Sequence, residues 1–476
     1  MLTAVRLRRA VVAAVIATLA LAATAQARPQ YRGVQVHSLW GSVTDAQMDR
    51  DLDMAAGAGA NVVRVDVSWA GLEETRGDFS GWYEQRVDRF MDAAGQRGLK
   101  VIATLWETPC WASTAPDDKK QGCVGAWWDR GVTRYPPADA SDYGDAVRFF
   151  VNRYSSHLAA LEVWNEPNLT TYLKGSDPDA SYAALVRAAY PAADHRVPVL
   201  AGSLSYGDVD FLQASLYAHG AKGSYDGLSI HPYADGRAPD VMGDLSWREY
   251  TFAGGISMFH DAATAAGDDA PIWVTEFGWP TCSLTSCNTL TEQAEYIGQS
   301  FDVLDGFAYV KGATVYQLRD MFTDAADPEA NFGMLREDYS PRPAYAALRA
   351  ALTAPTGSSD SSTPTTTTGD GSAGGVPPTK GRRKASTRRR AALVLRVKRR
   401  RGRVVAYGRA PKGQTVRLSV LRRAPAKRWT VVRSVRLRVG RSGRFVRRVG
   451  SVRALRGHAV RAAVAGRRTA RIARVR

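Results

Sequence analysis

Short apolar segments alternate with longer amphipathic segments along the first 350 residues of the chain. Each apolar segment ends in polar or aromatic residues, which is typical of a buried β-strand. This pattern predicts eight strands, at residues 33–37, 61–69, 99–106, 161–166, 197–203, 227–231, 272–277 and 313–318. The segments between them repeat apolar residues at helical spacing and predict helices at residues 45–58, 83–97, 141–155, 180–193, 209–220, 247–266, 291–304 and 343–351.

This alternation of strands and helices indicates an α/β protein, because parallel strands need helical crossover connections. Eight such units between residues 31 and 352 predict a (β/α)8 TIM barrel. The alternative is an open, doubly wound sheet. The first predicted strand is not followed by the GxGxxG fingerprint of many such sheets. We therefore expect residues 28–352 to form a barrel domain.

The composition changes twice after the predicted barrel. Residues 353–390 are rich in Ser, Thr, Pro and Gly and then become basic, which predicts a flexible linker. Residues 391–476 alternate Val and Leu with Arg, and Gly-containing turns separate the alternating runs. This period of two predicts a small, basic, antiparallel all-β domain of sandwich-like form.

Charge is distributed unevenly between these parts. The chain has a net charge of +18, but residues 371–476 contain 35 Lys and Arg and no Asp or Glu. Residues 1–370 therefore hold only 29 of the 64 basic residues and all 46 acidic ones. The isoelectric point of about 9.9 thus describes the tail rather than the whole molecule. It does not support nucleic-acid binding by the chain as a whole.

The first 27 residues have the composition of a secretory signal. Arg6, Arg8 and Arg9 precede an apolar run at residues 10–23, and Ala25-Gln26-Ala27 is an A-x-A cleavage site. The run is shorter than the roughly 20 residues of a membrane span. An uncleaved anchor is the alternative. We expect a secreted, extracellular protein that associates with the cell wall. We also expect that the mature chain begins near residue 28 and has no transmembrane segment.

The cysteines agree with an exported protein. They form two local pairs, and we expect the disulfides Cys110–Cys123 and Cys282–Cys287. The alternative, a metal site, fits poorly because the spacing is not that of a zinc knuckle and no histidines cluster nearby. We expect neither a metal nor a cofactor.

Two predicted strands end in a glutamate. Barrel enzymes carry catalytic groups at the C-terminal ends of their strands. Glu166 follows the fourth strand and Glu276 lies near the end of the seventh. Two facing carboxyls can divide the work of glycoside cleavage, one protonating the leaving oxygen and the other attacking the sugar carbon. The alternative is that both glutamates form structural ion pairs.

The residues around these glutamates resemble a known group of enzymes. Trp164-Asn165-Glu166-Pro167 and Thr275-Glu276-Phe277-Gly278-Trp279 are similar to motifs of retaining glycoside hydrolases of clan A, in the style of families 39 and 5 (cellulase-like). The resemblance covers residues 31–352. It implies an O-glycosyl hydrolase that cleaves β-glycosidic bonds of a polysaccharide by double displacement, with Glu166 as acid/base and Glu276 as nucleophile.

The same resemblance implies roles for further residues. Asn165 would hydrogen-bond the 2-hydroxyl of the sugar, and Arg64 would keep the nucleophile ionised. His231 and Tyr233 match a pair near the nucleophile, and Tyr233 would donate a hydrogen bond to Glu276. The alternatives are that Arg64 is an ordinary buried salt-bridge residue and that His231 is a structural histidine.

Aromatic residues near the strand ends predict a surface for sugar rings. Many clan members end the eighth strand with a Trp that underlies the sugar, but here Tyr316 or Gln317 takes that place. His37 and Tyr316 are further candidate substrate contacts. Tryptophans at or just past the strand ends are candidate stacking residues, although core packing is the alternative for each: Trp40, Trp69, Trp106 and Trp279.

Other acidic residues near strand ends have two interpretations. Asp66, Glu107 and Asp320 would either bind sugar hydroxyls or cap and pair within the fold. Glu162 lies four residues before Glu166, deeper along the same predicted strand, and receives no role.

The basic tail predicts a partner of opposite charge. We expect residues 391–476 to bind an anionic cell-wall polymer or an acidic glycan, since Arg suits phosphate and carboxylate groups. Few aromatics lie there, which argues against nucleic acid. The alternative functions are a non-catalytic carbohydrate-binding barrel and a cell-wall adhesion protein. We expect a monomer, and glucan, xylan, mannan and acidic exopolysaccharide all stay open as substrates.

Overall fold

The computed structural model describes residues 28–355 except 80, 245–246 and 285–286, together with the backbone of seven strands between residues 394 and 474. The predicted signal at residues 1–27 and most of the predicted linker lie outside the described residues. The chain divides into two compact units, residues 1–363 and 364–476, and each is described by itself.

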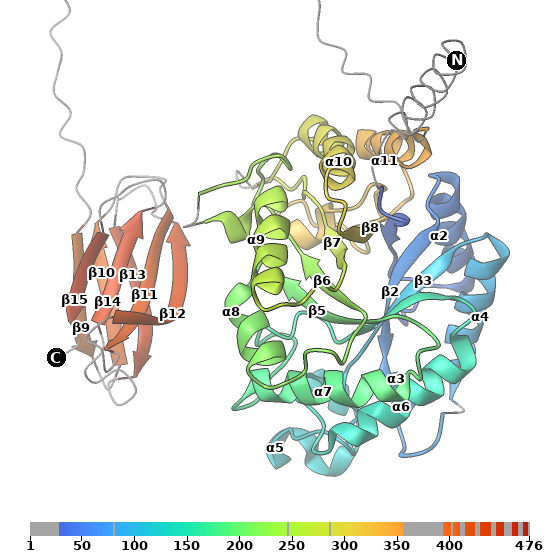
Figure 1. Cartoon of the computed structure of the whole chain (residues 1–476), viewed down its shortest axis with the longest axis horizontal. Coiled ribbons are helices and arrows are strands. Elements are labelled where there is room, and N and C mark those ends of the chain that lie inside the picture. Colours follow the sequence, from blue (N-terminus) through green and yellow to red (C-terminus); the bar gives the residue numbers. More distant parts are fainter. Residues whose placement is uncertain are drawn as a thin grey trace, which may run out of the picture. The chain divides into compact units, whose positions relative to one another are not determined.

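The first unit is a closed barrel of eight parallel strands in sequence order, in which β1 pairs with both β2 and β8 (Figure 1). The closure confirms the predicted (β/α)8 fold and rules out the open sheet. The strands are β1 (Tyr31–Gln35), β2 (Val62–Ser68), β3 (Lys100–Trp106), β4 (Leu158–Val163), β5 (Val199–Ser205), β6 (Gly227–His231), β7 (Ile272–Phe277) and β8 (Val310–Val315).

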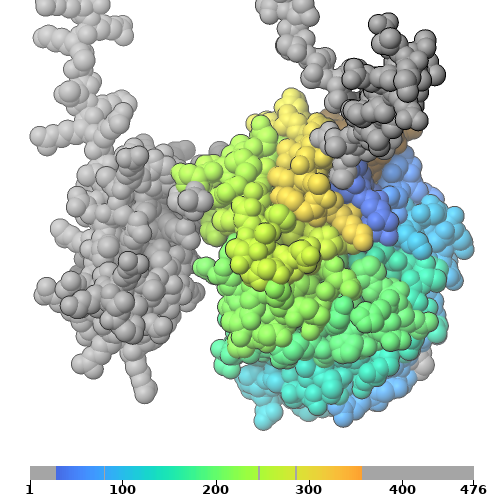
Figure 2. All heavy atoms as spheres, in the orientation of Figure 1, coloured from blue at the N-terminus to red at the C-terminus, as the bar shows by residue number. Residues whose placement is uncertain are grey.

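Helices surround the barrel, and the middle part of the chain covers much of the face seen in Figure 2. The longer helices are α2 (Asp45–Gly57), α4 (Trp82–Gln96), α6 (Ala140–Tyr154), α7 (Pro178–Ala192), α9 (Phe252–Ala265), α10 (Leu290–Asp305) and α11 (Pro343–Thr353). Shorter helices are α3 (Trp69–Leu72), α5 (Asp117–Lys120) and α8 (Val209–Leu212).

Local sequence explains where these elements start. Thr44 and Thr289 cap α2 and α10 with capping boxes, in which the side chains of Gln47 and Glu292 bond back to the cap. The strands β4, β5 and β7 are buried at every position. Strands that are buried on both faces consist mostly of apolar residues, and the sequence therefore predicted their positions.

Several predicted boundaries are wrong by a few residues. The fourth strand was expected at residues 161–166 but spans Leu158–Val163, and the eighth, expected at 313–318, spans Val310–Val315. In both cases the first residues of the strand include a small or polar one, Ala159 or Lys311, which interrupts the apolar pattern. The helix expected at 247–266 begins only at Phe252, and the one expected at 209–220 is α8 followed by a π-helical turn at Gln213–Tyr217.

An aromatic ring fills the lower interior of the barrel. Trp273 of β7 packs with apolar residues of β2, β3 and β5, and Tyr31 stacks on it with ring centroids 5.3 Å apart. Glycines make room for this ring, because a Cβ atom on Gly312 would lie 2.3 Å from it and one on Gly227 would lie 2.8 Å from its Nε1 atom. The indole therefore forms an apolar floor inside the barrel.

The described backbone of the second unit contains two antiparallel sheets. One has the order β13-β10-β9 and the other β12-β11-β14-β15. Their strands are β9 (Val394–Arg400), β10 (Arg403–Arg409), β11 (Thr415–Arg423), β12 (Trp429–Arg438), β13 (Arg444–Ser451), β14 (Ala459–Val464) and β15 (Ala470–Arg474). A single sandwich-like domain with the boundaries given above stays a prediction.

None of the helices within the described part of the chain combines the length and the apolar character that crossing a bilayer would require.

Candidate active site

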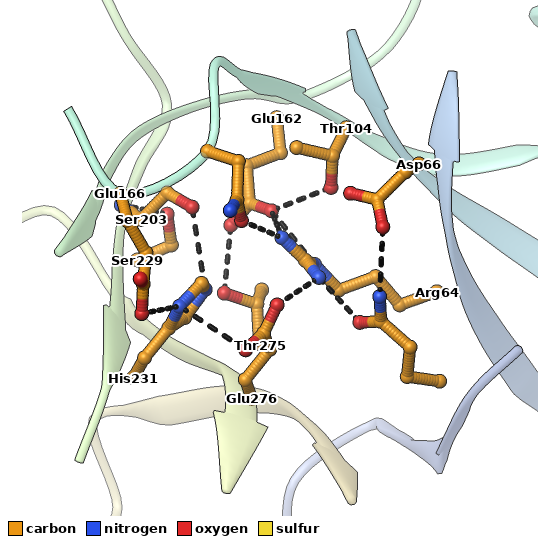
Figure 3. A network of polar contacts seen from close by, with 12 residues as sticks. Arg64, Asp66, Thr104, Glu162, Glu166, Ser203, Ser229, His231, Thr275 and Glu276 are labelled. Carbon is orange, nitrogen blue, oxygen red and sulfur yellow. Dashed lines mark hydrogen bonds and ion pairs between the residues drawn. The ribbon is translucent and has the colours of Figure 1, made fainter. Parts of the chain in front are cut away.

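Polar side chains from β2, β4, β6 and β7 meet inside the barrel (Figure 3). They include both glutamates of the sequence motifs, Glu166 and Glu276, together with Arg64 and His231. One oxygen of Glu166, one of Glu276 and one ring nitrogen of His231 all lie within 4.8 Å of one another. The strand order thus brings together residues that are 110 positions apart in sequence.

Arg64 is the centre of this network and is fully buried. Its guanidinium forms an ion pair with Glu276 and donates hydrogen bonds to the side chains of Gln35 and Asn165, the latter at 3.0 Å. It also pairs with Glu162 at 2.8 Å. No part of Arg64 is exposed, and its polar contacts are with the protein groups just named; its role toward a substrate stays a prediction.

Glu162 is a residue that the sequence interpretation missed. It has no exposure to solvent, and Thr104 and Thr275 each donate a hydrogen bond of 2.7 Å to its carboxylate. Burial opposes its ionisation, but the charges of Arg64 and His231 and the two threonine bonds lower its pKa overall. The signal available in the sequence was a charged residue in the middle of a strand buried at every position.

Glu276 is the next-to-last residue of β7, and two side chains bind its carboxylate. Tyr233 donates a hydrogen bond of 2.8 Å to Oε2, the contact expected from the sequence, while Arg64 pairs with Oε1. Burial raises the pKa of Glu276, whereas His231 and Arg64 act to lower it. The lowering effect expected of Arg64 is therefore present, but burial outweighs it.

Glu166 lies three residues beyond the end of β4 on a strained backbone. Its φ is 42° and that of Trp164 is 67°, both in the left-handed region that side-chain-bearing residues rarely adopt. Such strain concentrates at functional sites. Burial raises the pKa of the Glu166 carboxyl to about 7, against the opposing effects of a Ser205 hydrogen bond and the Arg64 charge.

His231 lies between the two glutamates. Its Nδ1 is 3.1 Å from Oε1 of Glu166 and 3.4 Å from Oε2 of Glu276, and its Nε2 is 3.2 Å from the hydroxyl of Ser203. Burial lowers the pKa of the ring. We assign a proton to Nδ1, because that nitrogen faces the two carboxyls.

Three of the described residues have ligand atoms close enough together to hold a metal ion, namely Glu166, His231 and Glu276. Two carboxylates and one imidazole suit several divalent cations. The same atoms already bond with one another and with Arg64 and Tyr233. A reaction without metal or cofactor stays a prediction.

Asn165 is placed so that part of its amide is available. Its Oδ1 accepts from Arg64, which fixes the orientation of the amide and leaves the NH₂ group to donate. The side chain is next to Glu166 and its residue is 7% exposed. Binding of a sugar hydroxyl by this group stays a prediction.

His37 and Tyr316 lie side by side at the edge of the site. The His37 ring is 5.7 Å from that of Tyr316 and 4.3 Å from that of Trp40, which is 42% exposed. Tyr316 also contacts Tyr233, at 6.3 Å between ring centroids, and donates a hydrogen bond to Glu329. Burial, followed by the charge of Arg64, lowers the pKa of His37 to about 3, so this ring is neutral.

The tryptophans divide between the core and the site. The prediction for Trp279 is wrong, because it is only 1% exposed, packs against Phe252 and Phe277, and donates its indole hydrogen to the carbonyl of Arg237. Trp69 has no exposure and belongs to the core as well. A sugar ring cannot stack on a face that other side chains already cover.

Trp106, in contrast, is the last residue of β3 and lies beside the site. Its ring contacts those of Trp164 and Tyr172, at centroid distances of 6.3 and 5.6 Å. The guanidinium of Arg134 covers it at 4.3 Å. Any stacking by Trp106 therefore involves Arg134 as well.

Three other acidic residues were left open between sugar binding and structure. Asp320 pairs with Arg342 at 2.6 Å and accepts from the amide of Gly333, so it is structural. Asp66 accepts from Gln35 at 3.1 Å, while its Oδ1 is buried without a hydrogen-bond partner in the described region. Glu107 lies 3.6 Å from Arg134.

Both predicted disulfides are present. Cys110 pairs with Cys123 and Cys282 pairs with Cys287. The first closes the loop after β3 and the second closes the loop after β7. These loops follow strands that end at the site, so each disulfide restrains a segment bordering it.

Comparison with known proteins agrees with this geometry. The profile of the family "Cellulase (glycosyl hydrolase family 5)" matches residues 21–308. No curated protein matches the chain. A family 39 glycoside hydrolase from the gut symbiont Bacteroides cellulosilyticus WH2 has a similar fold, with a TM-score of 0.53 and 17% identity over 90% of this chain and 82% of its own. The GH39 enzyme of Xanthomonas axonopodis pv. citri gives a TM-score of 0.49 and 17% identity over 89% and 91%.

Proposed function

Since the chain belongs to the cellulase family, glycosyl hydrolase family 5, and is thus an O-glycosyl hydrolase, we propose that it is a secreted enzyme that cleaves β-glycosidic bonds of a polysaccharide with retention of configuration. Glu276 is the nucleophile and Glu166 is the general acid and base. The family profile covers the strands that carry both groups, and the following observations support the proposed roles.

The spacing of the two carboxyls carries the proposal. Retaining glycosidases hold their carboxyls about 5–5.5 Å apart, whereas inverting enzymes separate them by about 6.5–9.5 Å to admit a water. Oxygens of Glu166 and Glu276 lie within 4.8 Å of one another. An approach this close between one oxygen of each carboxyl fits the short separation of a retaining pair better than the long one of an inverting pair.

The reaction then has two steps. In the first, the Glu276 carboxylate attacks the anomeric carbon, the glycosidic C–O bond breaks, and Glu166 gives its proton to the departing oxygen. In the second, Glu166 takes a proton from water, the oxygen of that water attacks the anomeric carbon, and the bond to Glu276 breaks. Both carboxyls return to their starting states.

The surroundings of the two glutamates support this division. Glu276 has a direct ion pair with Arg64 and a hydrogen bond from Tyr233, and both stabilise its charged form. Glu166 has no such ion pair with Arg64, and its pKa near 7 keeps it protonated in mildly acidic solution. These contacts favour an ionised Glu276 opposite a protonated Glu166, while burial raises the pKa of both carboxyls.

The stereochemical course tests the mechanism. The parent protein is incubated with a panel of β-linked polysaccharides, and the anomer first released is followed by NMR, with Glu276→Gln as the matched control. We expect the β-anomer first and loss of release in the variant. Release of the α-anomer would point to inversion, and equal release by Glu276→Gln would exclude it as the nucleophile.

We further propose that the second unit retains the enzyme at an anionic cell-wall polymer or an acidic glycan. The register of β9 and β10 supports this, because Arg396, Lys398 and Arg400 share one sheet face with Arg403 and Arg409. Removal of residues 353–476 should leave hydrolysis of soluble glycan intact and abolish sedimentation with cell envelopes. Retained sedimentation would refute this role.

Export rests on the N-terminal pattern and on the disulfides. Both bonds lie in loops next to the site, and such bonds persist in oxidising compartments. We expect the mature protein in the culture medium or on the wall, beginning near residue 28. N-terminal sequencing of the exported protein tests this.

A further inference from the structure

One guanidinium beside the site has a buried donor without a partner among the described residues. Arg134 ends the short helical turn Val132–Arg134, beyond the loop that the Cys110–Cys123 disulfide closes, and its Nη1 atom is buried without a partner in the described part of the chain. Its nearest acidic group is Glu107, whose Oε1 is 3.6 Å from Nη2, too far for a hydrogen bond. The side chain as a whole is 29% exposed, and the buried part includes Nη1.

This guanidinium is held in place by aromatic rings. It lies 4.3 Å from the centroid of Trp106 and 5.6 Å from that of Tyr172. A guanidinium stacked on aromatic faces keeps its N–H edge available for a planar anion. The rings therefore hold Arg134 in place, and its Nη1 has no hydrogen-bond partner among the described residues.

The position of Tyr172 places Arg134 beside the catalytic carboxyls. Backbone hydrogen bonds join Glu166 to Leu169 and Leu169 to Tyr172, so Tyr172 belongs to the short segment that follows the acid/base. The pKa of Tyr172 is raised by burial and then by the charges of Glu166 and Glu276. One aromatic side chain thus separates Arg134 from the reacting groups.

A second cation adjoins Arg134. The amide of Lys174 donates a hydrogen bond of 2.8 Å to the carbonyl of Arg134, and its ammonium lies 5.6 Å from the ring of Tyr135. Burial, followed by the like charges of Lys119 and Arg134, lowers the pKa of Lys174. No carboxylate of the described residues forms an ion pair with Lys174.

The counterion of Arg134 is Glu107. Burial raises the pKa of Glu107, and the charge of Arg134 acts to lower it. Residues 1–370 carry 46 acidic and 29 basic side chains, so the body as a whole repels polyanions. Arg134 and Lys174 are therefore a local cluster of positive charge in a unit whose charged side chains are mostly acidic.

We propose that Arg134, with Lys174 beside it, binds the carboxylate of a uronic acid residue in the substrate, which makes the substrate an acidic polysaccharide. This proposal rests on the proposed hydrolase function and narrows its substrate class. The planar fork of Arg134 matches a carboxylate in two parallel hydrogen bonds. The sugar ring that carries this carboxylate would lie next to Glu166.

Matched substrates test this proposal with the full chain. Oligosaccharides from hyaluronate, alginate and glucuronoxylan are compared with the same oligosaccharides after chemical reduction of their carboxyls to alcohols. We expect the parent to cleave at least one acidic substrate with a kcat/KM about 10-fold or more above that of its reduced form. Faster cleavage of the reduced forms would overturn the proposal.

Variants assign the preference to the residue. Arg134→Gln should lose about 10- to 100-fold in kcat/KM on the acidic substrate, mostly through KM, the range expected for hydrogen bonds to a charged group. It should change less than 2-fold on the reduced form. Lys174→Gln should show a smaller loss in the same direction. Equal losses on both substrates would overturn the proposal.

The matched control is Arg76→Gln. Arg76 stacks on Trp111 at 4.7 Å but is 66% exposed and pairs with Asp142. It should leave the preference for acidic substrate unchanged. The basic tail is identical in all these proteins, so its attraction to polyanions cancels when each variant is compared with the parent on the same substrate.

The outcome separates this proposal from the one it rests on. Cleavage of neutral glycans alone, abolished by Glu276→Gln, would refute the acidic substrate and leave the hydrolase in place. No cleavage of any glycan would refute the hydrolase function itself.

Discussion

Replacing Glu162 by glutamine removes one negative charge from the barrel interior and keeps the shape of the side chain. The carboxylate has no exposure and accepts from Arg64, Thr104 and Thr275. A glutamine carbonyl oxygen can still accept from Arg64 and Thr104, and the Thr275 hydroxyl can turn to accept from the new NH₂ group. The variant therefore isolates the effect of the charge.

The expected cost follows from burial. Breaking a fully buried ion pair by removing one partner costs about 3–5 kcal/mol. Because the hydrogen bonds survive in Glu162→Gln, we expect about 3 kcal/mol. At about 2 °C per kcal/mol for a domain of this size, Tm should fall by about 6 °C. Thermal unfolding followed by circular dichroism measures this.

Activity should change in a way that a purely structural residue would not produce. The negative charge of Glu162 helps to raise the pKa of Glu166, after the larger effect of burial. Glu166 must be protonated to act as an acid, so activity falls as pH rises through its pKa. In Glu162→Gln this alkaline fall in kcat/KM should occur at lower pH than in the parent.

A second buried pair provides the control. Asp51 and Arg319 are joined at 3.0 Å, and each side chain is 3% exposed. Asp51→Asn should lower Tm by a comparable amount without moving the alkaline limb. If Glu162→Gln changes neither Tm nor the pH profile, the carboxyl is not charged in the folded protein and the reasoning is wrong.

Three further predictions follow from the same contacts. Glu166 binds a proton more tightly in the folded protein, so the folded state loses about 3 kcal/mol of stability as pH rises from about 4.5 through about 7. Glu166→Gln should therefore unfold at a higher temperature than the parent at pH 8 and at nearly the same temperature at pH 4. Equal Tm values for the variant and the parent at both pH values would contradict this. Tyr233→Phe removes the hydrogen bond to Glu276 and should lower kcat at least about 10-fold with little change in Tm; unchanged kcat would exclude a role in orienting the nucleophile. Loss of the Cys110–Cys123 disulfide, which spans 13 residues, should lower the free energy of unfolding by about 3 kcal/mol, against about 2 kcal/mol for Cys282–Cys287, which spans 5. Denaturant titration of the two double serine variants measures this, and the reverse order would contradict it.

Much of the site was predictable because it lies at the ends of strands. The apolar runs located β4 and β7, and a parallel barrel brings all strand ends to one rim. Glu166 and Glu276 therefore had to approach one another once the eight-unit pattern was recognised. The hydrogen bond from Tyr233 to Glu276 followed from motif resemblance and is present.

Other features depended on packing that no local pattern shows. Trp279 follows a strand just as Trp106 does, yet one ring is covered by Phe252 and Phe277 while the other lies under Arg134. The difference comes from neighbours contributed by distant segments. In the same way, the absence of a hydrogen-bond partner for Nη1 of Arg134 among the described residues depends on the positions of all its neighbours in the fold.

The sequence by itself determined the barrel, the two disulfides and the pair of glutamates, because each is set by a pattern within a short stretch or by chain order. Only the tertiary structure decided that Glu162 and Arg64 form the buried pair beneath the nucleophile. A charge in the middle of a strand reveals that it needs a partner. Which partner it finds depends on the register of four strands closing around the same axis, and that register is a property of the assembled barrel.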